Sequence, residues 1–294
     1  SIRNSVVSRA KHLGYTPQSV RGAKAYVDLT IYPPDTPSTI VIAKDTQFAS
    51  TVNGVAYVFA TTTSTTINVN ANGIYTSANV ELSQGLPLTH RYTANTNDPD
   101  QKFILPNANT DTSTLVVKIQ TSASDSNTFV YSVANDTTTV NSTSNVYFLE
   151  ESEDGKYEVL FGDDIIGRKP VTGNIVILQS LIADADQPNG ASSFTPVGTV
   201  GGYANVVVST LSSASGGSLR DTVQKIKFNA PRSFQAQNRA VTLNDYIRIL
   251  QRDYTAAESV VAWGGEDNDP PVYGKVYLAV KPAGGLTLSD ATKT

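Results

Sequence analysis

The side chains that could do acid–base chemistry gather in one acidic stretch. Its members are Glu150, Glu151, Glu153, Asp154 and Glu158, with Asp163 and Asp164 close behind. Two carboxylates held about 5–9.5 Å apart are what a glycoside hydrolase requires. Turn chemistry explains the same residues, because a turn at residues 153–155 would join two strands ending at Leu149 and starting at Tyr157. We favour the hairpin over the catalytic pair.

Other catalytic and ligand-binding patterns are weak. His12 and His90 are the two histidines, neither lies in a recognisable motif, and a serine hydrolase needs a histidine base. Cysteine is absent, which excludes disulfides and thiolate metal sites. The Asn-rich residues 68–73 are arranged like a calcium loop, but its twelfth position is Asn79 and not Glu, so a turn is predicted. We therefore predict no enzyme activity, no cofactor and no metal.

Composition narrows the class of protein further. The net charge is −4 and Lys and Arg form no cluster, which argues against nucleic-acid binding. No apolar run approaches the roughly 20 residues that span a bilayer, and the mixed, polar first residues do not resemble a signal peptide. Charged residues make up only 16% of the chain, and Ser, Thr and Asn are abundant, a mix that is typical of strand-rich proteins with polar turns.

Alternating apolar residues predict that most of the regular secondary structure is β-strand. The predicted strands are residues 25–31, 39–42, 55–59, 115–119, 129–133, 146–149, 157–161, 175–178 and 206–210. Asn53-Gly54 predicts a hairpin turn between the strands at 39–42 and 55–59. Residues 60–78 are rich in Thr, Ser and Asn. The strands at 157–161 and 175–178 are expected to be joined by a tight loop fixed by Gly and Pro.

Three complete helices are predicted. The first carries Ile2, Val6, Ala10 and Leu13 on one face and ends at Gly14. In the second, a capping box of Ser218 and Asp221 precedes an apolar stripe, and Pro231 is expected to end the helix. The third follows a capping box of Thr242 and Asp245, and its apolar positions include Leu243, Tyr246, Ile247, Leu250 and Tyr254. A hairpin of residues 259–263 and 273–281 follows, and residues 286–294 are predicted to begin another helix.

These elements predict an α+β fold that is mostly β and has several domains, as expected for 294 residues. We expect an N-terminal helical segment at residues 1–24, a β domain at 25–93 and a second β domain at 94–200. An α+β unit with two capped helices and a hairpin would occupy residues 201–294. The antiparallel strand-rich domains thus precede a small helical and hairpin unit.

The segment FGDDIIGRKPVTGN, residues 161–174, resembles the FGDG-x-x-G-x-x-P-x-x-G segment of phage baseplate J-like proteins. The matching positions are Phe161, Gly162, Asp163, Gly167, Pro170 and Gly173. A second match comprises Ala230-Pro231, residues 238–242 and Asp245-Tyr246, and Asn189-Gly190 lies where the family often has a turn. Asp164 stands where the family usually has Gly, and Asp tolerates a left-handed backbone better than most residues. The order of the motifs agrees over about half the chain.

The resemblance implies a structural component of a contractile-tail baseplate wedge. Its expected partners are further copies of itself, arranged in rings, and other phage baseplate wedge proteins, without nucleic acid or membrane. Its expected location is the tail baseplate of the virion, after assembly in the bacterial host cytoplasm. The absence of methionine predicts a C-terminal fragment that begins internally, unless methionines are missing from the sequence.

We expect the contacts between proteins to involve the first helix and the final α+β unit. The residues concerned are Ile2, Val6, Tyr246, Leu250 and Tyr254. Asp163 and Arg168 could add a charged contact, although a solvated loop tip also explains each of them. The alternative function is a receptor- or carbohydrate-binding tail protein, which would expose Trp or Tyr beside Asn or Asp. A glycan hydrolase is the third possibility and would need two carboxylates in a cleft.

Overall fold

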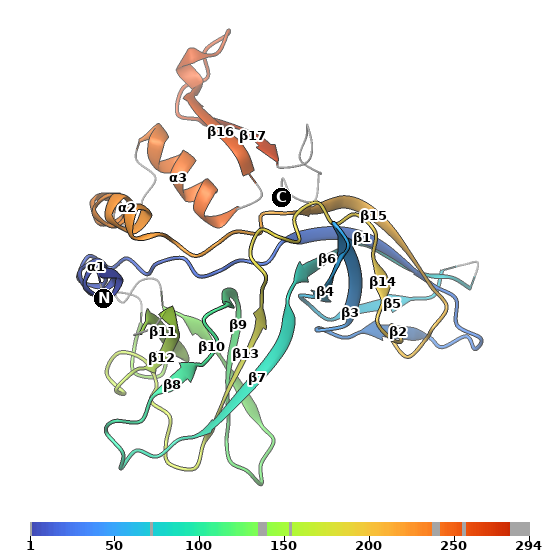
Figure 1. The fold of residues 1–294 in the computed structure, drawn as a ribbon, viewed down its shortest axis with the longest axis horizontal. Helices are drawn as coiled ribbons and strands as arrows, with labels where there is room; N and C mark the ends of the chain where they lie inside the picture. Colours follow the sequence, from blue (N-terminus) through green and yellow to red (C-terminus); the bar gives the residue numbers. More distant parts are fainter. Residues whose placement is uncertain are drawn as a thin grey trace. The chain divides into compact units, whose positions relative to one another are not determined.

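The computed structural model describes residues 2–70, 73–134, 140–152, 155–236, 242–254 and 257–282. The fold is mostly β with a few short helices, as predicted (Figure 1). The chain forms two compact units that alternate along the sequence. The first unit comprises Ser1–Val20, Pro87–Ala183 and Arg220–Pro231, and the second comprises Arg21–Leu86, Asp184–Leu219 and Arg232–Thr294. The division into four successive domains stays a prediction.

The first unit contains a seven-stranded sheet. The strand order is β7 (Leu86–Thr93), β13 (Ile175–Ile182), β9 (Thr110–Gln120), β10 (Thr128–Val133), β11 (Val146–Glu151), β12 (Tyr157–Phe161) and β8 (Phe103–Leu105). β10 and β11 run parallel, whereas β9 pairs antiparallel with both β10 and β13. Alternate apolar residues of these strands, among them Val117, Ile119, Tyr157 and Val159, form the buried core of the unit.

The predicted strands at 157–161 and 175–178 exist as β12 and β13, but they are not neighbours. β12 pairs antiparallel with β11 and β8, whereas β13 lies between β7 and β9. The loop between them therefore connects two separate positions of one sheet. The predicted hairpin before it is confirmed, because β11 and β12 are antiparallel partners from Tyr147↔Phe161 to Glu151↔Tyr157.

Helix α1 (Ile2–His12) ends as predicted. Gly14 has a φ of 69°, and the N–H groups of Gly14 and Tyr15 donate to the carbonyls of Lys11 and Ala10. This is the Schellman arrangement that Gly favours, since a side chain is costly in the left-handed conformation. Val7 and Ala10 pack against two residues of helix α2 (Val223–Ala236), Ile226 and Ala230, and form a small core between the helices.

Helix α2 departs from the prediction at both ends. It begins at Val223, and Thr222 Oγ1 accepts a hydrogen bond of 3.2 Å from the Lys225 N–H. Ser218 instead pairs through its backbone with Arg21, so the capping box of Ser218 and Asp221 does not form. Pro231 lies inside the helix and does not end it. The apolar face that packs on α1 evidently outweighs the hydrogen bond that a proline removes.

The second unit contains a six-stranded antiparallel sheet. Its order is β14 (Thr195–Pro196), β3 (Gln47–Val52), β4 (Val55–Thr61), β6 (Tyr75–Gln84), β1 (Lys24–Ile31) and β15 (Val206–Ser215). The turn between β3 and β4 has positive φ at Asn53 (50°) and Gly54 (81°), which confirms the predicted turn. It joins β4 to β3, however, and not to the strand of residues 39–42 as predicted. A ribbon of β2 (Thr39–Ile42) and β5 (Thr65–Asn68) adds Ile40, Ile42 and Ile67 to the same core.

Two stretches of residues 60–78 are strands that sequence analysis did not predict. They form β5 and the start of β6, where Ile67, Tyr75 and Ser77 are buried. Thr is β-branched and suits a strand, so a Thr-rich sequence can pair in a sheet if every second residue is buried.

The predicted final helix and hairpin are present in the second unit. Helix α3 (Leu243–Asp253) packs against β16 (Ala257–Gly264), which pairs antiparallel with β17 (Val276–Pro282). The capping box is confirmed, since Thr242 and Asp245 each accept a hydrogen bond from the other's backbone N–H. Residues 71 and 72 of the calcium-loop-like stretch, Glu153, Asp154, residues 238–241 and residues 286–294 lie outside the described residues.

Candidate interaction surfaces

The FGDD loop, residues 162–170, is organised by its own carboxylates. Asp163 Oδ1 accepts hydrogen bonds of 3.0 Å from the N–H groups of both Ile165 and Ile166. Asp164 Oδ1 accepts one of 2.9 Å from the Lys169 N–H. Asp164 has a φ of 67°, so the position where the family pattern has Gly does adopt a left-handed backbone.

Close backbone contact explains the first glycine of this loop. A Cβ at Gly162 would lie 2.1 Å from the Ile166 carbonyl oxygen and 2.2 Å from that of Gly167. Gly167 has a φ of 87°, and its N–H donates to the Asn141 carbonyl at 3.0 Å. The glycine spacing thus serves a compact loop that is anchored to residues 141–144.

Asp163 and Arg168 lie on this loop but have different contacts. The backbone N–H groups of Ile166 and Ile165, helped by the Lys169 charge, lower the pKa of the exposed Asp163 carboxyl below its ordinary value of 3.8. The Arg168 guanidinium lies 5.7 Å from the centre of the Phe129 ring, and its backbone N–H donates to the Ser144 carbonyl at 2.8 Å. Both residues stabilise the loop, and their role in an interface stays a prediction.

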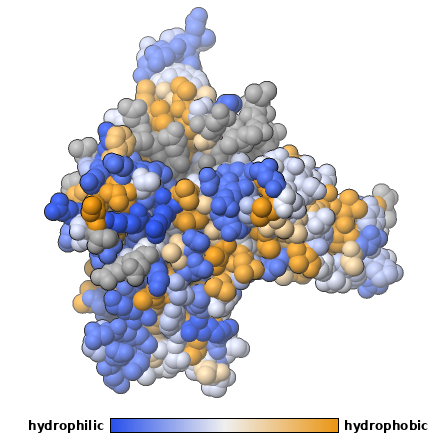
Figure 2. Space-filling model, in the orientation of Figure 1, coloured by the Kyte–Doolittle hydropathy of each residue, from blue (hydrophilic) through white to orange (hydrophobic). Residues whose placement is uncertain are grey.

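Exposed apolar side chains accompany the loop. Ile165, Ile166 and Val171 are exposed, as is Phe129 on β10. Figure 2 shows hydrophobic residues in small groups among hydrophilic ones on the face it presents. Scattered exposed apolar residues are common on soluble proteins, so these residues alone do not define a binding site.

The acidic residues of β11 are neutralised by cations of α1. Arg3 Nε lies 2.7 Å from Glu151 Oε1, and Arg3 Nη2 lies 2.9 Å from Glu151 Oε2. Lys11 pairs with Glu150. Each carboxylate therefore holds the first helix against the sheet, an arrangement that disfavours the catalytic pair considered above.

Asp221 is a second anchor for the N-terminal segment. Its buried carboxylate accepts hydrogen bonds from the Tyr15 hydroxyl at 2.7 Å and the Gln18 N–H at 3.0 Å, and it pairs with Lys225 at 2.9 Å. Sequence analysis assigned Asp221 to a helix cap and missed this role. No local pattern signals it, because Tyr15 and Asp221 are far apart in the chain.

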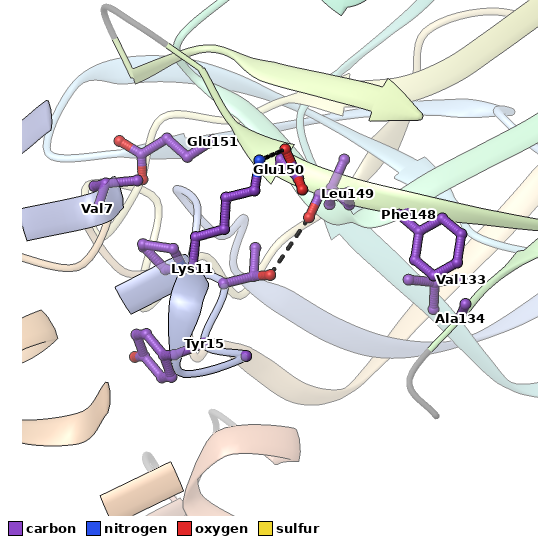
Figure 3. Close-up of a pocket in the computed structure, with 12 residues that line it drawn as sticks. Val7, Lys11, Tyr15, Val133, Ala134, Phe148, Leu149, Glu150 and Glu151 are labelled. Atoms are coloured by element: carbon purple, nitrogen blue, oxygen red, sulfur yellow. Dashed lines mark hydrogen bonds and ion pairs between the residues drawn. The ribbon is translucent and has the colours of Figure 1, made fainter. Parts of the chain in front are cut away.

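A pocket of about 320 Å³ lies between α1 with its following turn and the ends of β10 and β11 (Figure 3). Lys11 reaches across it to Glu150, while Val7, Tyr15 and Phe148 contribute apolar surface. The wall therefore combines apolar side chains with a neutralised ion pair. Within the described part of the chain, no three His, Cys, Asp or Glu side chains are grouped to hold a metal ion.

The predicted interface residues belong to three separate elements. On α1, Ile2 is 75% exposed, whereas Val6 is partly buried against the small core that α1 forms with α2. Asp163 and Arg168 lie on the FGDD loop. On α3, Tyr246, Leu250 and Tyr254 recur every four residues on one face, and all three are partly buried. Burial raises the pKa of Tyr254. That these residues contact a partner stays a prediction.

The single tryptophan lies on the final hairpin. Its indole Nε1 donates to Asn268 Oδ1 at 2.9 Å, and its ring stacks on Tyr277, the directly opposed residue of β17, with centroids 5.8 Å apart. Of the helices in the described part of the chain, none has the length and apolar character that crossing a bilayer requires.

Comparison with known proteins agrees with the motifs. Residues 242–294, which include α3, β16 and β17, match the family described as "Baseplate structural protein gp6, C-terminal domain I". The chain is also 23% identical over 177 residues to the baseplate wedge protein gp6 of Enterobacteria phage T4. The chain resembles a baseplate wedge protein. The match covers 52% of the chain and 26% of the relative, so the chain spans about a quarter of that protein.

A chain in the cryo-EM structure of the anti-feeding prophage baseplate also matches. It is 12% identical, and the match covers 91% of this chain and 49% of that one, with a TM-score of 0.29. That score is too low to indicate a shared fold.

Proposed function

We propose that the chain is a structural, non-enzymatic part of a contractile-tail baseplate wedge. The match of residues 242–294 to a C-terminal domain of baseplate structural protein gp6 carries this proposal. The wider similarity to the wedge protein of phage T4 supports it, since that match extends over 177 residues. The chain would join copies of itself into rings and contact other wedge proteins.

The contacts of the first unit suit such a role. Two ion pairs, Arg3–Glu151 and Lys11–Glu150, join α1 to β11 within this unit. Its FGDD loop is held by hydrogen bonds from backbone to carboxylate and from backbone to backbone. Polar and charged groups that already have partners within the unit order its surface, which supports a structural role.

The proposal places the protein in the tail baseplate of the virion, after assembly in the host cytoplasm. Protein surfaces are its proposed partners, and nucleic acid and membranes are not. Rings arise when each copy presents two different faces or when a two-fold contact alternates with a second contact. Permanent contacts of this kind usually bury more than about 2,000 Å².

A phage with a stop codon in the gene for this protein tests the proposal. Electron microscopy should show tails without complete baseplates, and the full protein supplied from a plasmid should restore them. Normal tails without the protein would overturn the proposal. Sedimentation of the 294-residue chain as a strict monomer at high concentration would count against contacts between copies.

The alternative, a glycan-binding tail protein, rests on the final hairpin. Trp263 stacks on Tyr277, and Asn268 accepts the indole hydrogen bond, so this aromatic pair already has internal partners. A Trp263→Ala virion that assembles normally but no longer adsorbs to host cells would favour this alternative. A Trp263→Ala virion that adsorbs normally would leave the structural role as the better account.

A further inference from the structure

Among the described residues, most of the outer edge of β15 has no partner strand in the six-stranded sheet. β15 is the last strand of that sheet and pairs on one side with β1 (Figure 1). Near its end, Ala214 exchanges hydrogen bonds of 2.7 Å with Gly190 and Ala191. Among the described residues, no hydrogen bond other than those to β1 involves residues 206–213. A stretch of eight residues therefore presents unpaired backbone groups.

The other three edges of the two large sheets carry the usual protection against pairing. β8 has three residues, and β14 has two, one of which is Pro196. β7 is longer but contains Pro87, His90 and Arg91. Short length, proline and charge all hinder the addition of another strand. β15 has ten residues, VVVSTLSSAS, with no charge and no proline. Its register with β1 is regular from Val206 to Thr210 and shifts beyond Thr210, so residues 206–210 are the part of this edge that is most open to pairing.

We propose that β15 pairs antiparallel with β15 of a second copy of the chain, centred on Ser209. This inference rests on the proposed function and names the surface for one contact between copies. Only an extended strand can satisfy a row of alternating N–H and C=O groups. A two-fold axis makes such a contact self-complementary, since both copies present the same strand.

The exposed side chains of β15 favour pairing with the same strand of a second copy, and they favour one register. Val206 and Val208 pack toward the core of their own unit, while Val207 and Leu211 point away and are each 53% exposed. With Ser209 opposite Ser209 of the second copy, Val207 of each copy faces Leu211 of the other. Leu211 lies at the shift in the β1 register, at the end of the regular stretch. The two large apolar side chains exposed on this strand thus cover one another. No charge on the strand opposes self-pairing.

Cysteine cross-linking tests this register, because the chain has no cysteine of its own. Directly opposed Cα atoms in an antiparallel pair lie about 4.5–5.5 Å apart, which is within the range that a disulfide bridges. Ser209→Cys should therefore give a disulfide-linked dimer under mild oxidation. Ser213→Cys is the matched control on the same strand, and it should stay monomeric because its two copies would lie far apart along the strands.

A mixture of Val207→Cys and Leu211→Cys chains should give a cross-linked heterodimer, whereas neither variant should link to itself. Cross-linking of Ser213→Cys as efficient as that of Ser209→Cys would overturn the proposal. A failure of Ser209→Cys to cross-link in a chain with the wild-type circular dichroism spectrum would also overturn it.

A charge at the centre provides a test without cysteine. Ser209→Lys places like charges opposite one another and should weaken dimerisation at least about tenfold in sedimentation experiments. Thr76→Lys, at an exposed position of the central strand β6, should dimerise like wild type. Wild-type dimerisation in Ser209→Lys would overturn the proposal, as would a wild-type chain that stays monomeric at millimolar concentration.

These results separate the inference from the proposed function. If Ser209→Cys does not cross-link, or if Ser209→Lys dimerises like wild type, while the protein is still required for baseplate assembly, only the β15 contact is wrong. If Ser209→Cys cross-links as expected but tails assemble without the protein, the strand contact holds and the baseplate role fails.

Discussion

Arg3 and Glu151, which are 148 positions apart in the sequence, form a bidentate ion pair. The two N–O distances are 2.7 and 2.9 Å, and the side chains are 17% and 2% exposed. A planar guanidinium matches a carboxylate in this geometry and gives strong, directional hydrogen bonds. The pair fixes the first turn of α1 to the end of β11.

Glu151→Gln should lower the free energy of unfolding of the first unit by about 2–4 kcal/mol, because it leaves Arg3 largely buried without a charged partner. Urea unfolding followed by circular dichroism measures this change. Glu150→Gln is the matched control, since the Lys11–Glu150 pair is more exposed and should contribute less than about 1 kcal/mol. Equal losses in the two variants would contradict the assigned role of Arg3.

Tyr15→Phe should destabilise the first unit by about 1–3 kcal/mol. The change removes the 2.7 Å hydrogen bond that the tyrosine hydroxyl donates to the buried Asp221 carboxylate, and a hydrogen bond to a charged group is worth more than a neutral one. Tyr273→Phe is the control, because Tyr273 is highly exposed. If Tyr15→Phe unfolds at the same urea concentration as wild type, Asp221 does not anchor the segment after α1.

The FGDD loop should become less ordered in acid. The pKa of Asp163 is lowered in the folded chain, so its ionisation stabilises the fold above the ordinary pKa of 3.8. That stabilisation is lost as the pH falls below 3.8 and through the lowered value. NMR should show faster amide exchange at Ile165 and Ile166 in this range. Asp163→Asn should show no such pH dependence, and a carboxyl titration at or above 3.8 would rule out the mechanism.

Gly162→Ala should disrupt the same loop sterically. Its Cβ would lie 2.1 Å from a carbonyl oxygen, so the backbone must shift, at a cost of about 2–3 kcal/mol. Gly173→Ala is the comparison, since no atom lies within 4 Å of a Cβ there and only the φ of 93° is strained. Gly162→Ala should have a lower midpoint temperature of thermal unfolding than Gly173→Ala. The reverse order would show that the close approach at Gly162 is unimportant.

Sequence reasoning succeeded where local chemistry decides the structure. Alternation predicted β1 and β12, Asn53-Gly54 predicted the hairpin turn, and Gly14 predicted the end of α1. Each of these features depends on residues a few positions apart. The left-handed backbone at Asp164 was also anticipated as a possibility from the departure from the family pattern.

Long-range pairing was not predictable in the same way. Strands β12 and β13 follow one another in sequence but occupy separate places in the sheet, because the hydrophobic pattern specifies a face and not a neighbour. The ion pair of Arg3 with Glu151 and the hydrogen bond of Tyr15 to Asp221 join segments that are distant in sequence. Rules based on residue spacing cannot predict such contacts. The prediction that Pro231 ends the second helix was wrong for a related reason. Packing of α2 on α1 outweighs the local tendency of proline to end a helix.

The capping box of α3 should contribute to the stability of the C-terminal region that comprises α3, β16 and β17. Thr242→Ala removes the hydroxyl that accepts from the Asp245 N–H, and such a change costs about 0.5–2 kcal/mol. The loss should appear in unfolding of the α3, β16 and β17 region, reported by the fluorescence of Trp263 on β16. Thr89→Ala, on strand β7, lies at no helix end and should leave that transition unchanged. An unaltered tryptophan transition in Thr242→Ala would mean that packing of α3 on β16, and not its cap, determines the stability of this region.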